Sequence, residues 1–233
     1  MIFLGAFINA VLIIIGSFIG RLFRNFPEKT KETVMSIIGL AVAVLGIQMG
    51  FQSDHFVIII VSLVVGTLLG EWLDLDKWFN RFGKWVESLF GTKSNGSIAE
   101  GFVTASLIFV IGSMAIIGAL DSGLRNDHNI LFTKGVIDGF ASLILASTLG
   151  IGVLLSAVPV FLYEATIALA AGFISSYIPQ AALDLFIQEM TATGGIMIFA
   201  IGLNIANLTK IRIANLLPSI IIVGIIVACI FIF

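Results

Sequence analysis

The sequence predicts an all-α integral membrane protein, a polytopic bundle of about eight transmembrane helices in a single domain. Of its 233 residues, 59% are hydrophobic and 11% are charged, whereas a soluble domain carries about 25% charged residues. The mean hydropathy is +1.14. The apolar runs are long and continuous, not alternating, so they predict helices buried on all sides. The net charge of −2 and the lack of a basic stripe argue against nucleic acid as a partner.

Eight apolar runs approach the length of about 20 residues that an α-helix needs to cross a bilayer. The fifth and sixth runs are separated only around Ser156. The predicted spans cover residues 2–23, 34–50, 56–72, 102–120, 133–155, 157–178, 190–206 and 214–233.

The distribution of Lys and Arg predicts the orientation, because basic residues accumulate in cytoplasmic loops. The first, third and seventh loops hold ten basic residues, and the fourth holds the other two, Arg125 and Lys134. Placing the odd-numbered loops inside therefore puts both termini outside. The expected localisation is a bacterial plasma (inner) membrane, crossed several times.

The third loop contains a further helix at residues 75–90, with the sequence LDKWFNRFGKWVESLF. Its aromatic and aliphatic residues fall on one side of a helical projection and its basic residues on the other. This pattern is typical of a helix that lies in the membrane interface. The alternative is a helix packed against the underside of the protein itself. A flexible linker, GTKSNGS at 91–97, follows it.

A shift of 156 residues relates the first three spans to the last three. Three glycine pairs and one amide pair then coincide, and corresponding loops carry opposite charge bias, as oppositely oriented copies require. We therefore expect a first repeat at 1–73, an interfacial helix and linker at 74–100, a central helix pair at 101–155, and a second repeat at 156–233. Chance alignment of glycine-rich helices is the alternative. The coinciding pairs are Gly16/Gly172, Gly39/Gly195, Gly46/Gly202 and Gln48/Asn204.

Several glycines are four residues apart, a spacing that lets helices in membranes approach closely. The cluster Thr193-Gly194-Gly195 has a second interpretation, because adjacent glycines favour a broken helix whose freed backbone groups could face a ligand. The four-residue pairs are Gly16/Gly20, Gly46/Gly50, Gly66/Gly70 and Gly135/Gly139.

Ionisable residues inside a span are functional candidates because each costs roughly 2.5–3.5 kcal/mol on insertion scales. Glu164 lies seven residues into the sixth span. It is expected either to bind a proton or cation, or to be a neutral or amide-paired structural residue.

Asp121 and Asp138 lie near the outer ends of the fourth and fifth spans, and Lys134 is four residues before Asp138 on the same helical face. The three are expected to form a charge cluster, although a solvated helix end also explains Asp121. Two carboxylates at one lysine favour a cation or protons over an anion.

The amides Asn9, Gln48 and Asn204 either join helices or line a polar path. Glu71 and Glu189, at span ends, are expected to face water.

Three segments resemble a bacterial inner-membrane family catalogued as domain of unknown function 554, whose members are often labelled transport proteins. The resemblance covers nearly the whole chain and carries no established substrate or functional residue. The segments are GSMAIIGALDSGL (112–124), KGVIDGFASL (134–143) and GGIMIFAIGLNIANLTKIRIANLLP (194–218).

These observations predict a secondary transporter of a small cation, or of a small solute coupled to protons or cations, that works by alternating access. The alternatives are an oligomeric channel or facilitator, and a structural or regulatory membrane protein that transports nothing. No catalytic motif is present, so we expect no enzyme activity, cofactor or metal site; the expected partners are the lipid bilayer and a small ion or solute, with homo-oligomers an open alternative. The expected binding residues are Asp138, Glu164, Lys134, Asp121, Gln48, Asn204, Thr193, Gly194 and Gly195.

Overall fold

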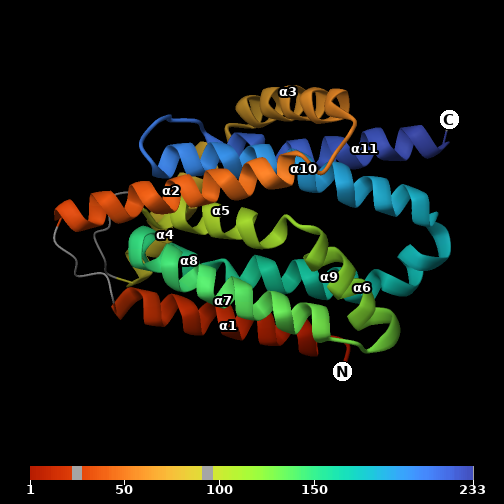
Figure 1. The fold of residues 1–233 in the computed structure, drawn as a ribbon, viewed down its shortest axis with the longest axis horizontal. Coiled ribbons are helices and arrows are strands. Elements are labelled where there is room, and N and C mark those ends of the chain that lie inside the picture. Colours follow the sequence, from red (N-terminus) through yellow and green to blue (C-terminus); the bar gives the residue numbers. More distant parts are fainter. Residues whose placement is uncertain (23–27, 91–96, 233) are drawn as a thin grey trace. The chain divides into compact units, whose positions relative to one another are not determined.

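The computed structural model describes residues 1–22, 28–90 and 97–232, and every regular element within them is a helix (Figure 1). Most of the predicted linker after the amphipathic helix, residues 91–96, lies outside this range. The elements are α1 (Leu4–Leu22), α2 (Glu28–Gly50), α3 (Phe56–Leu73), α4 (Leu75–Phe90), α5 (Ser97–Val110), α6 (Ser113–Arg125), α7 (Asn129–Leu149), α8 (Gly152–Leu155), α9 (Ala157–Tyr177), α10 (Gln180–Ile205), the 3₁₀ helix η1 (Ile213–Leu216) and α11 (Pro218–Ile232).

The described part of the chain contains seven helical segments long and apolar enough to cross a bilayer, and an eighth if a bent pair counts as one span. The all-α, multi-pass membrane fold predicted from composition is thus confirmed. The bent pair is α5 with α6, which meet at an angle of 62°. The predicted fourth span is therefore interrupted within its length.

The break between α5 and α6 lies at Gly112, whose φ of 154° and ψ of 145° are rarely available to a residue with a side chain. Of the two interpretations of Thr193-Gly194-Gly195, the broken helix is wrong, because α10 runs through these residues without interruption. A β-carbon on Gly195 would lie 2.4 Å from the backbone nitrogen of Gly50. Gly195 therefore serves close helix packing and not helix unwinding.

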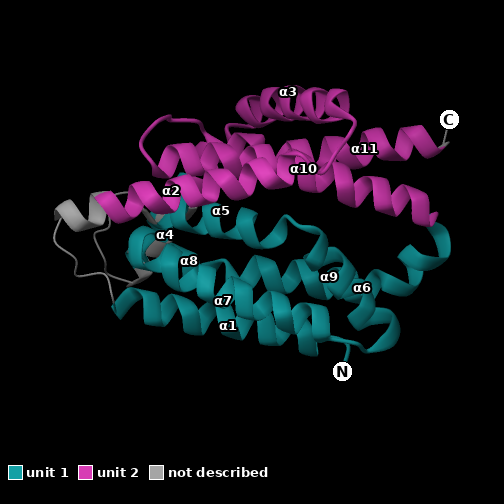
Figure 2. Cartoon of the chain, viewed as in Figure 1, with its two compact units in different colours: residues 1–27, 80–178 teal, residues 28–79, 179–233 magenta. Residues whose placement is uncertain are grey.

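The contacts divide the chain into two compact units (Figure 2). Unit 1 comprises residues 1–27 and 80–178, and unit 2 comprises residues 28–79 and 179–233. Each unit contains helices from both predicted repeats: α1 and α9 belong to unit 1, whereas α2, α3, α10 and α11 belong to unit 2. The predicted sequence segments and the contact units are therefore different divisions of the chain.

In unit 1, α1 and α7 pack along a glycine seam, formed by Gly16 and Gly20 of α1 and Gly135 and Gly139 of α7. A β-carbon at Gly16 would lie 2.0 Å from the carbonyl oxygen of Gly139, and one at Gly20 would lie 2.2 Å from that of Leu143. The residue numbers rise together along the seam, so α1 and α7 are parallel.

In unit 2, α2 and α10 pack along a second glycine seam, formed by Gly39, Gly46, Gly195 and Gly202. A β-carbon at Gly46 would lie 2.6 Å from the carbonyl oxygen of Gly195, and one at Gly39 would lie 2.7 Å from that of Gly202. The numbers run in opposite directions, so these helices are antiparallel. The same reasoning makes α3 and α11 antiparallel, since Gly66 meets Ser219 and Gly70 meets Asn215 of the preceding turn.

These directions indicate how α5 and α6 are used. The apolar segments between α1 and α7 are α2, α3 and the bent pair. If α2 and α3 each cross the membrane once, α1 and α7 run in the same direction only when the bent pair also crosses once. The same holds for α2 and α10, which are separated by α3, the bent pair, α7 and α9. If α3, α7 and α9 each cross once, α2 and α10 are antiparallel only when the bent pair also crosses once. Packing within each unit therefore supports eight crossings.

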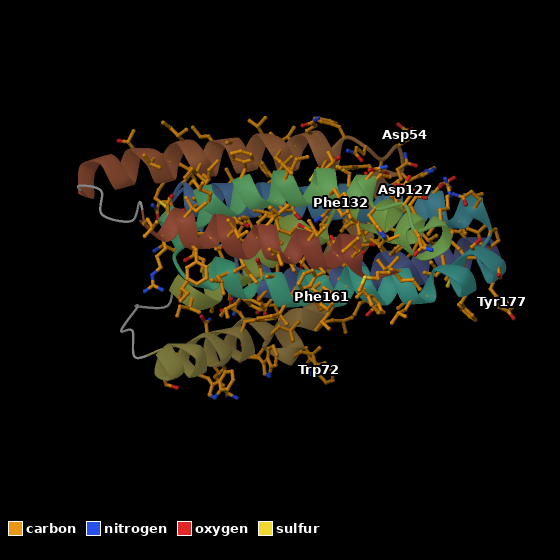
Figure 3. The ribbon with its side chains drawn as sticks, turned by 90° about the horizontal axis from the view of Figure 1, so that it is seen from below. Asp54, Trp72, Asp127, Phe132, Phe161 and Tyr177 are labelled. Carbon is orange, nitrogen blue, oxygen red and sulfur yellow. The ribbon has the colours of Figure 1, made fainter. Side chains whose placement is uncertain are left out.

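The outer surfaces of the long helices are apolar. Large hydrophobic side chains are exposed along them, for example Phe7 (58%), Val57 (74%) and Leu169 (66%). Exposed Trp72 at the end of α3 and Tyr177 at the end of α9 project outward (Figure 3). Apolar flanks with aromatic residues near helix ends are typical of contact with a bilayer.

The amphipathic segment forms α4 as predicted. Asp74, in the left-handed conformation with φ of 50°, ends α3, and the Asn215 side chain accepts a hydrogen bond from the backbone N–H of Asp76 in the first turn of α4 (2.7 Å). Asn215, which precedes α11 in the sequence, therefore caps the first turn of α4. Trp78 and Trp85 are each 58% exposed. The position of α4 in the membrane interface remains a prediction.

Candidate functional site

Four polar side chains meet in the interior of unit 1. Asn9 comes from α1, Lys134 and Asp138 from α7, and Glu164 from α9. Counted as whole residues, Asn9 and Glu164 have no exposed surface, and Lys134 and Asp138 are each 6% exposed. We call these four residues the charged cluster.

The cluster is joined by direct contacts. The Asn9 amide donates a hydrogen bond to Glu164 Oε1 (2.7 Å), and Lys134 Nζ lies 3.3 Å from the same oxygen. Lys134 also donates to Asp138 Oδ2, four residues along the same helix. Lys134 thus joins α7 to α9, and Asn9 joins α1 to α9.

The glycine seam of unit 1 brings these helices close enough for the contacts. A β-carbon at Gly135 would lie 3.0 Å from the Cα of Asn9, and one at Gly139 would lie 3.1 Å from the carbonyl oxygen of Leu12. Small residues at these positions let helix backbones approach. Because Gly135 has no side chain, α1 approaches α7 closely at Asn9. In this position Asn9 reaches the carboxylate of Glu164.

The cluster contains one more negative group than positive groups when all three ionisable side chains are charged. In addition, Glu164 Oε2 and Asn9 Oδ1 have no hydrogen-bond partner among the described residues and are both buried. Buried polar groups are usually paired. One cation or one proton would balance the charge, and the two free oxygens are acceptors suited to either.

Asp121 does not contribute to the cluster in the expected way. Its carboxylate lies 3.4 Å from Arg125, one turn along α6, and its side chain is 18% exposed. The second carboxylate at Lys134 is Glu164, which the sequence places in a separate span. Asp121 pairs with Arg125, four residues later in its own helix, whereas Lys134 and Asp138 face the interior of unit 1.

The remaining predicted residues belong to unit 2. Gln48 is exposed. Asn204 holds the loop after α10, since its Nδ2 donates to the carbonyl oxygen of Ile211 (2.7 Å) and its Oδ1 accepts from Thr209 (2.8 Å). Their binding roles remain predictions, as do those of Thr193, Gly194 and Gly195, which are buried in α10.

Sequence reasoning did not include Asn9 in the binding set and was wrong about Glu189. Glu189 was expected to face water but has no exposed surface. The reason is that α10 begins at Gln180, ten residues before the predicted span, so Glu189 lies well inside the helix. The sequence signal that could have identified Asn9 as a binding residue is its position as a polar residue within an otherwise apolar helix.

Comparisons with known proteins agree with a membrane protein. A family model described as a protein of unknown function, DUF554, matches residues 4–228. The "Uncharacterized membrane protein YdfK" of Bacillus subtilis (strain 168) is 37% identical over 223 residues, which cover 94% of this chain and 93% of that protein. The "Uncharacterized protein YqgA" of Escherichia coli (strain K12) is 28% identical over 221 residues, covering 93% and 92%. No solved structure matches.

Proposed function

We propose, since the chain belongs to the DUF554 family of proteins of unknown function, that it is a secondary transporter of a small cation, or of a small solute coupled to protons or cations. The observation that carries the proposal is the charged cluster, in which three helices of unit 1 bury two carboxylates against one lysine. Ionisable groups buried among the helices of membrane proteins often mark ion or proton pathways.

The contacts suggest how binding changes the helices. Lys134 pairs with Asp138 within α7 but with Glu164 across to α9. A cation or proton taken up at Glu164 competes with Lys134 for the same carboxylate, and Lys134 then keeps its partner on its own helix. Binding therefore weakens the link between α7 and α9 and leaves α7 intact.

The burial of the cluster favours a carrier over a water-filled pore. The side chains of Lys134, Asp138 and Glu164 are 7%, 9% and 0% exposed. A group shielded in this way exchanges its ligand when the surrounding helices move, which is the basis of alternating access.

An inverted repeat is part of the proposal, and packing supports it. A shift of 156 residues relates α1 to α9, α2 to α10, and α3 to η1 and α11, and the helices of each pair pack together within one unit. Gly39 meets Gly202, which is the equivalent of Gly46 under this shift, and Gly46 meets Gly195, which is the equivalent of Gly39. Reciprocal contact is what a twofold axis requires. Because equivalent helices are packed together, the proposed alternating access would involve movement of helices within a unit, as at the contact between α7 and α9.

The experiment uses the purified protein in liposomes that contain a pH-sensitive dye, with the membrane potential clamped. An imposed Na⁺ or Li⁺ gradient is expected to drive proton movement that empty liposomes lack. Glu164→Gln and Asp138→Asn are expected to abolish it. Asp121→Asn is the matched control, because it removes the same charge beside Arg125 and is expected to keep the movement. Wild-type vesicles that behave like empty ones would contradict the proposal and favour a protein that transports nothing.

A second measurement separates a carrier from a channel. Unlabelled Na⁺ inside the liposomes is expected to accelerate uptake of radioactive ²²Na⁺, and uptake is expected to saturate. Uptake that neither saturates nor responds to internal Na⁺ would indicate a channel or facilitator.

A further inference from the structure

Unit 2 contains a buried carboxylate that the charged cluster does not use. Glu189 of α10 has no exposed surface. Its Oε1 accepts a hydrogen bond from the Ser53 hydroxyl (2.6 Å), and its Oε2 has no partner among the residues that the structure describes. A buried carboxylate oxygen without a donor is unusual in folded proteins.

Thr193 supplies a second free oxygen on the same side of α10. It lies four residues after Glu189, so the two side chains are neighbours on the helix surface. Its side chain has no exposed surface, and no described residue hydrogen-bonds to Oγ1. A threonine inside a helix commonly donates to the carbonyl oxygen four residues earlier, and Thr193 does not.

Ser53 connects these groups to the outside. It is half-buried in the turn between α2 and α3, and it lines an apolar groove of about 210 Å³ together with Gly50, Ile196 and Phe199. Ser53 Oγ also accepts a hydrogen bond from the backbone N–H of His55 (2.9 Å). The hydroxyl that donates to Glu189 is thus also part of the groove surface.

We propose that Glu189, Thr193 and Ser53 form a second cation site, which binds one small monovalent cation such as Na⁺. The donor set consists of carboxylate and hydroxyl oxygens, which are ligands that hard cations prefer. One carboxylate matches one positive charge, and no Lys or Arg side chain is paired with Glu189 within the described ranges. This site lies in unit 2, separate from the charged cluster of unit 1, and does not depend on the proposed transport.

A structural interpretation of the same contacts is an anchor for the turn after α2. Gln188 Nε2 donates to the carbonyl oxygen of Gln52 (2.8 Å), next to the Ser53–Glu189 bond. An anchor requires an acceptor at residue 189 but neither a negative charge nor Thr193. The two interpretations therefore predict different behaviour for conservative variants.

The test measures labelling of the purified wild-type protein by dicyclohexylcarbodiimide, which reacts with buried protonated carboxyl groups. The labelled residue is identified by mass spectrometry of peptides, at fixed pH, with choline replacing Na⁺ at constant ionic strength. Na⁺ at ten times its dissociation constant is expected to lower labelling of Glu189 about tenfold, as mass action requires. Thr193→Val, which keeps the shape, is expected to shift this protection to higher Na⁺ concentration.

A second readout is thermal stability in detergent. Na⁺ is expected to raise the midpoint of wild-type unfolding above that in choline, and Glu189→Gln is expected to remove most of this rise while its amide oxygen still accepts from Ser53. Asp184→Asn is the matched control, since Asp184 is an exposed carboxylate on the same helix. It is expected to leave the Na⁺ response unchanged.

Two outcomes would overturn the site: labelling of Glu189 that is independent of Na⁺, or a Na⁺-induced stabilisation that Glu189→Gln and Thr193→Val both retain. Labelling of Glu164 in the same samples reports on the charged cluster. Failure at Glu189 can therefore be distinguished from failure of the proposed function, which the liposome experiment measures.

Discussion

The glycine seams of unit 1 and unit 2 are similar in construction. In each, glycines of two helices bring the backbones together, as at Gly16 with Gly139 and at Gly46 with Gly195. In each unit one helix of the bundle also buries a glutamate completely, Glu164 in unit 1 and Glu189 in unit 2. The seams differ in direction, since the helices are parallel in unit 1 and antiparallel in unit 2.

The important difference is what surrounds each glutamate. Glu164 has a lysine, an amide and a second carboxylate nearby, whereas the described contact of Glu189 is the Ser53 hydroxyl. In unit 1 the protein supplies its own cation, so a ligand has to compete with Lys134. In unit 2 a cation would bind without such competition. Two equally buried carboxylates thus lie in different charge environments, and the two proposals assign them different ligand competition for that reason.

Removal of Lys134 is expected to have the largest effect on stability. Lys134→Met leaves Asp138 and Glu164 buried without a cation, and breaking such a pair costs about 3–5 kcal/mol. Titration with sodium dodecyl sulfate measures the free energy of unfolding. The double variant Lys134→Met/Asp138→Asn is expected to recover part of the loss. Glu189→Gln should change stability little, and equal losses in the two units would refute the comparison.

Alanine in either glycine seam is expected to come next. A β-carbon at Gly16 or Gly46 would lie within 2.6 Å of backbone atoms, and such overpacking costs about 3 kcal/mol. Gly172→Ala is the control in unit 1, because nothing lies within 4 Å of its β-carbon, and Gly50→Ala is the control in unit 2, where the nearest atom is 3.8 Å away. The same titration should show both controls neutral or slightly stabilised, since alanine favours helix.

The sequence predicts the spans well because crossing a bilayer requires a long apolar run, and this requirement is local. It also identifies Glu164, whose charge interrupts such a run. It does not identify the partner of Glu164, because Asn9 and Lys134 belong to other helices and only packing brings the three together.

Boundaries and breaks are harder to predict. Polar residues at the start of α10 lower the local hydropathy, so Glu189 is assigned to a helix end although it is buried. Adjacent glycines at 194–195 resemble a helix break, yet α10 is continuous there, and the bend between α5 and α6 occurs at Gly112, which has no glycine beside it. Whether a glycine bends a helix or lets another helix approach depends on what lies opposite, and the sequence does not contain that information.

Loss of the hydrogen bond to each glutamate is expected to have a smaller effect. Asn9→Ala removes the donor to Glu164 and should destabilise the protein by about 2 kcal/mol, a typical value for a bond to a charged group. Ser53→Ala removes the corresponding donor to Glu189 but should cost about 1 kcal/mol, because Ser53 is half-buried and water can replace it. If Ser53→Ala loses more free energy of unfolding than Asn9→Ala in the same titration, the hydrogen bond to Glu189 stabilises the protein more than the hydrogen bond to Glu164 does, contrary to this prediction.

The smallest effect is expected at the amides that are equivalent in the predicted repeat. Asn204 makes hydrogen bonds to Thr209 and Ile211, so Asn204→Ala should destabilise the protein by about 1 kcal/mol. Gln48 is exposed, and Gln48→Ala should leave the free energy of unfolding unchanged. If Asn204 only holds its loop, neither variant alters cation-driven proton movement in liposomes. A loss of that movement in Asn204→Ala, with stability retained, would instead assign Asn204 a role in transport.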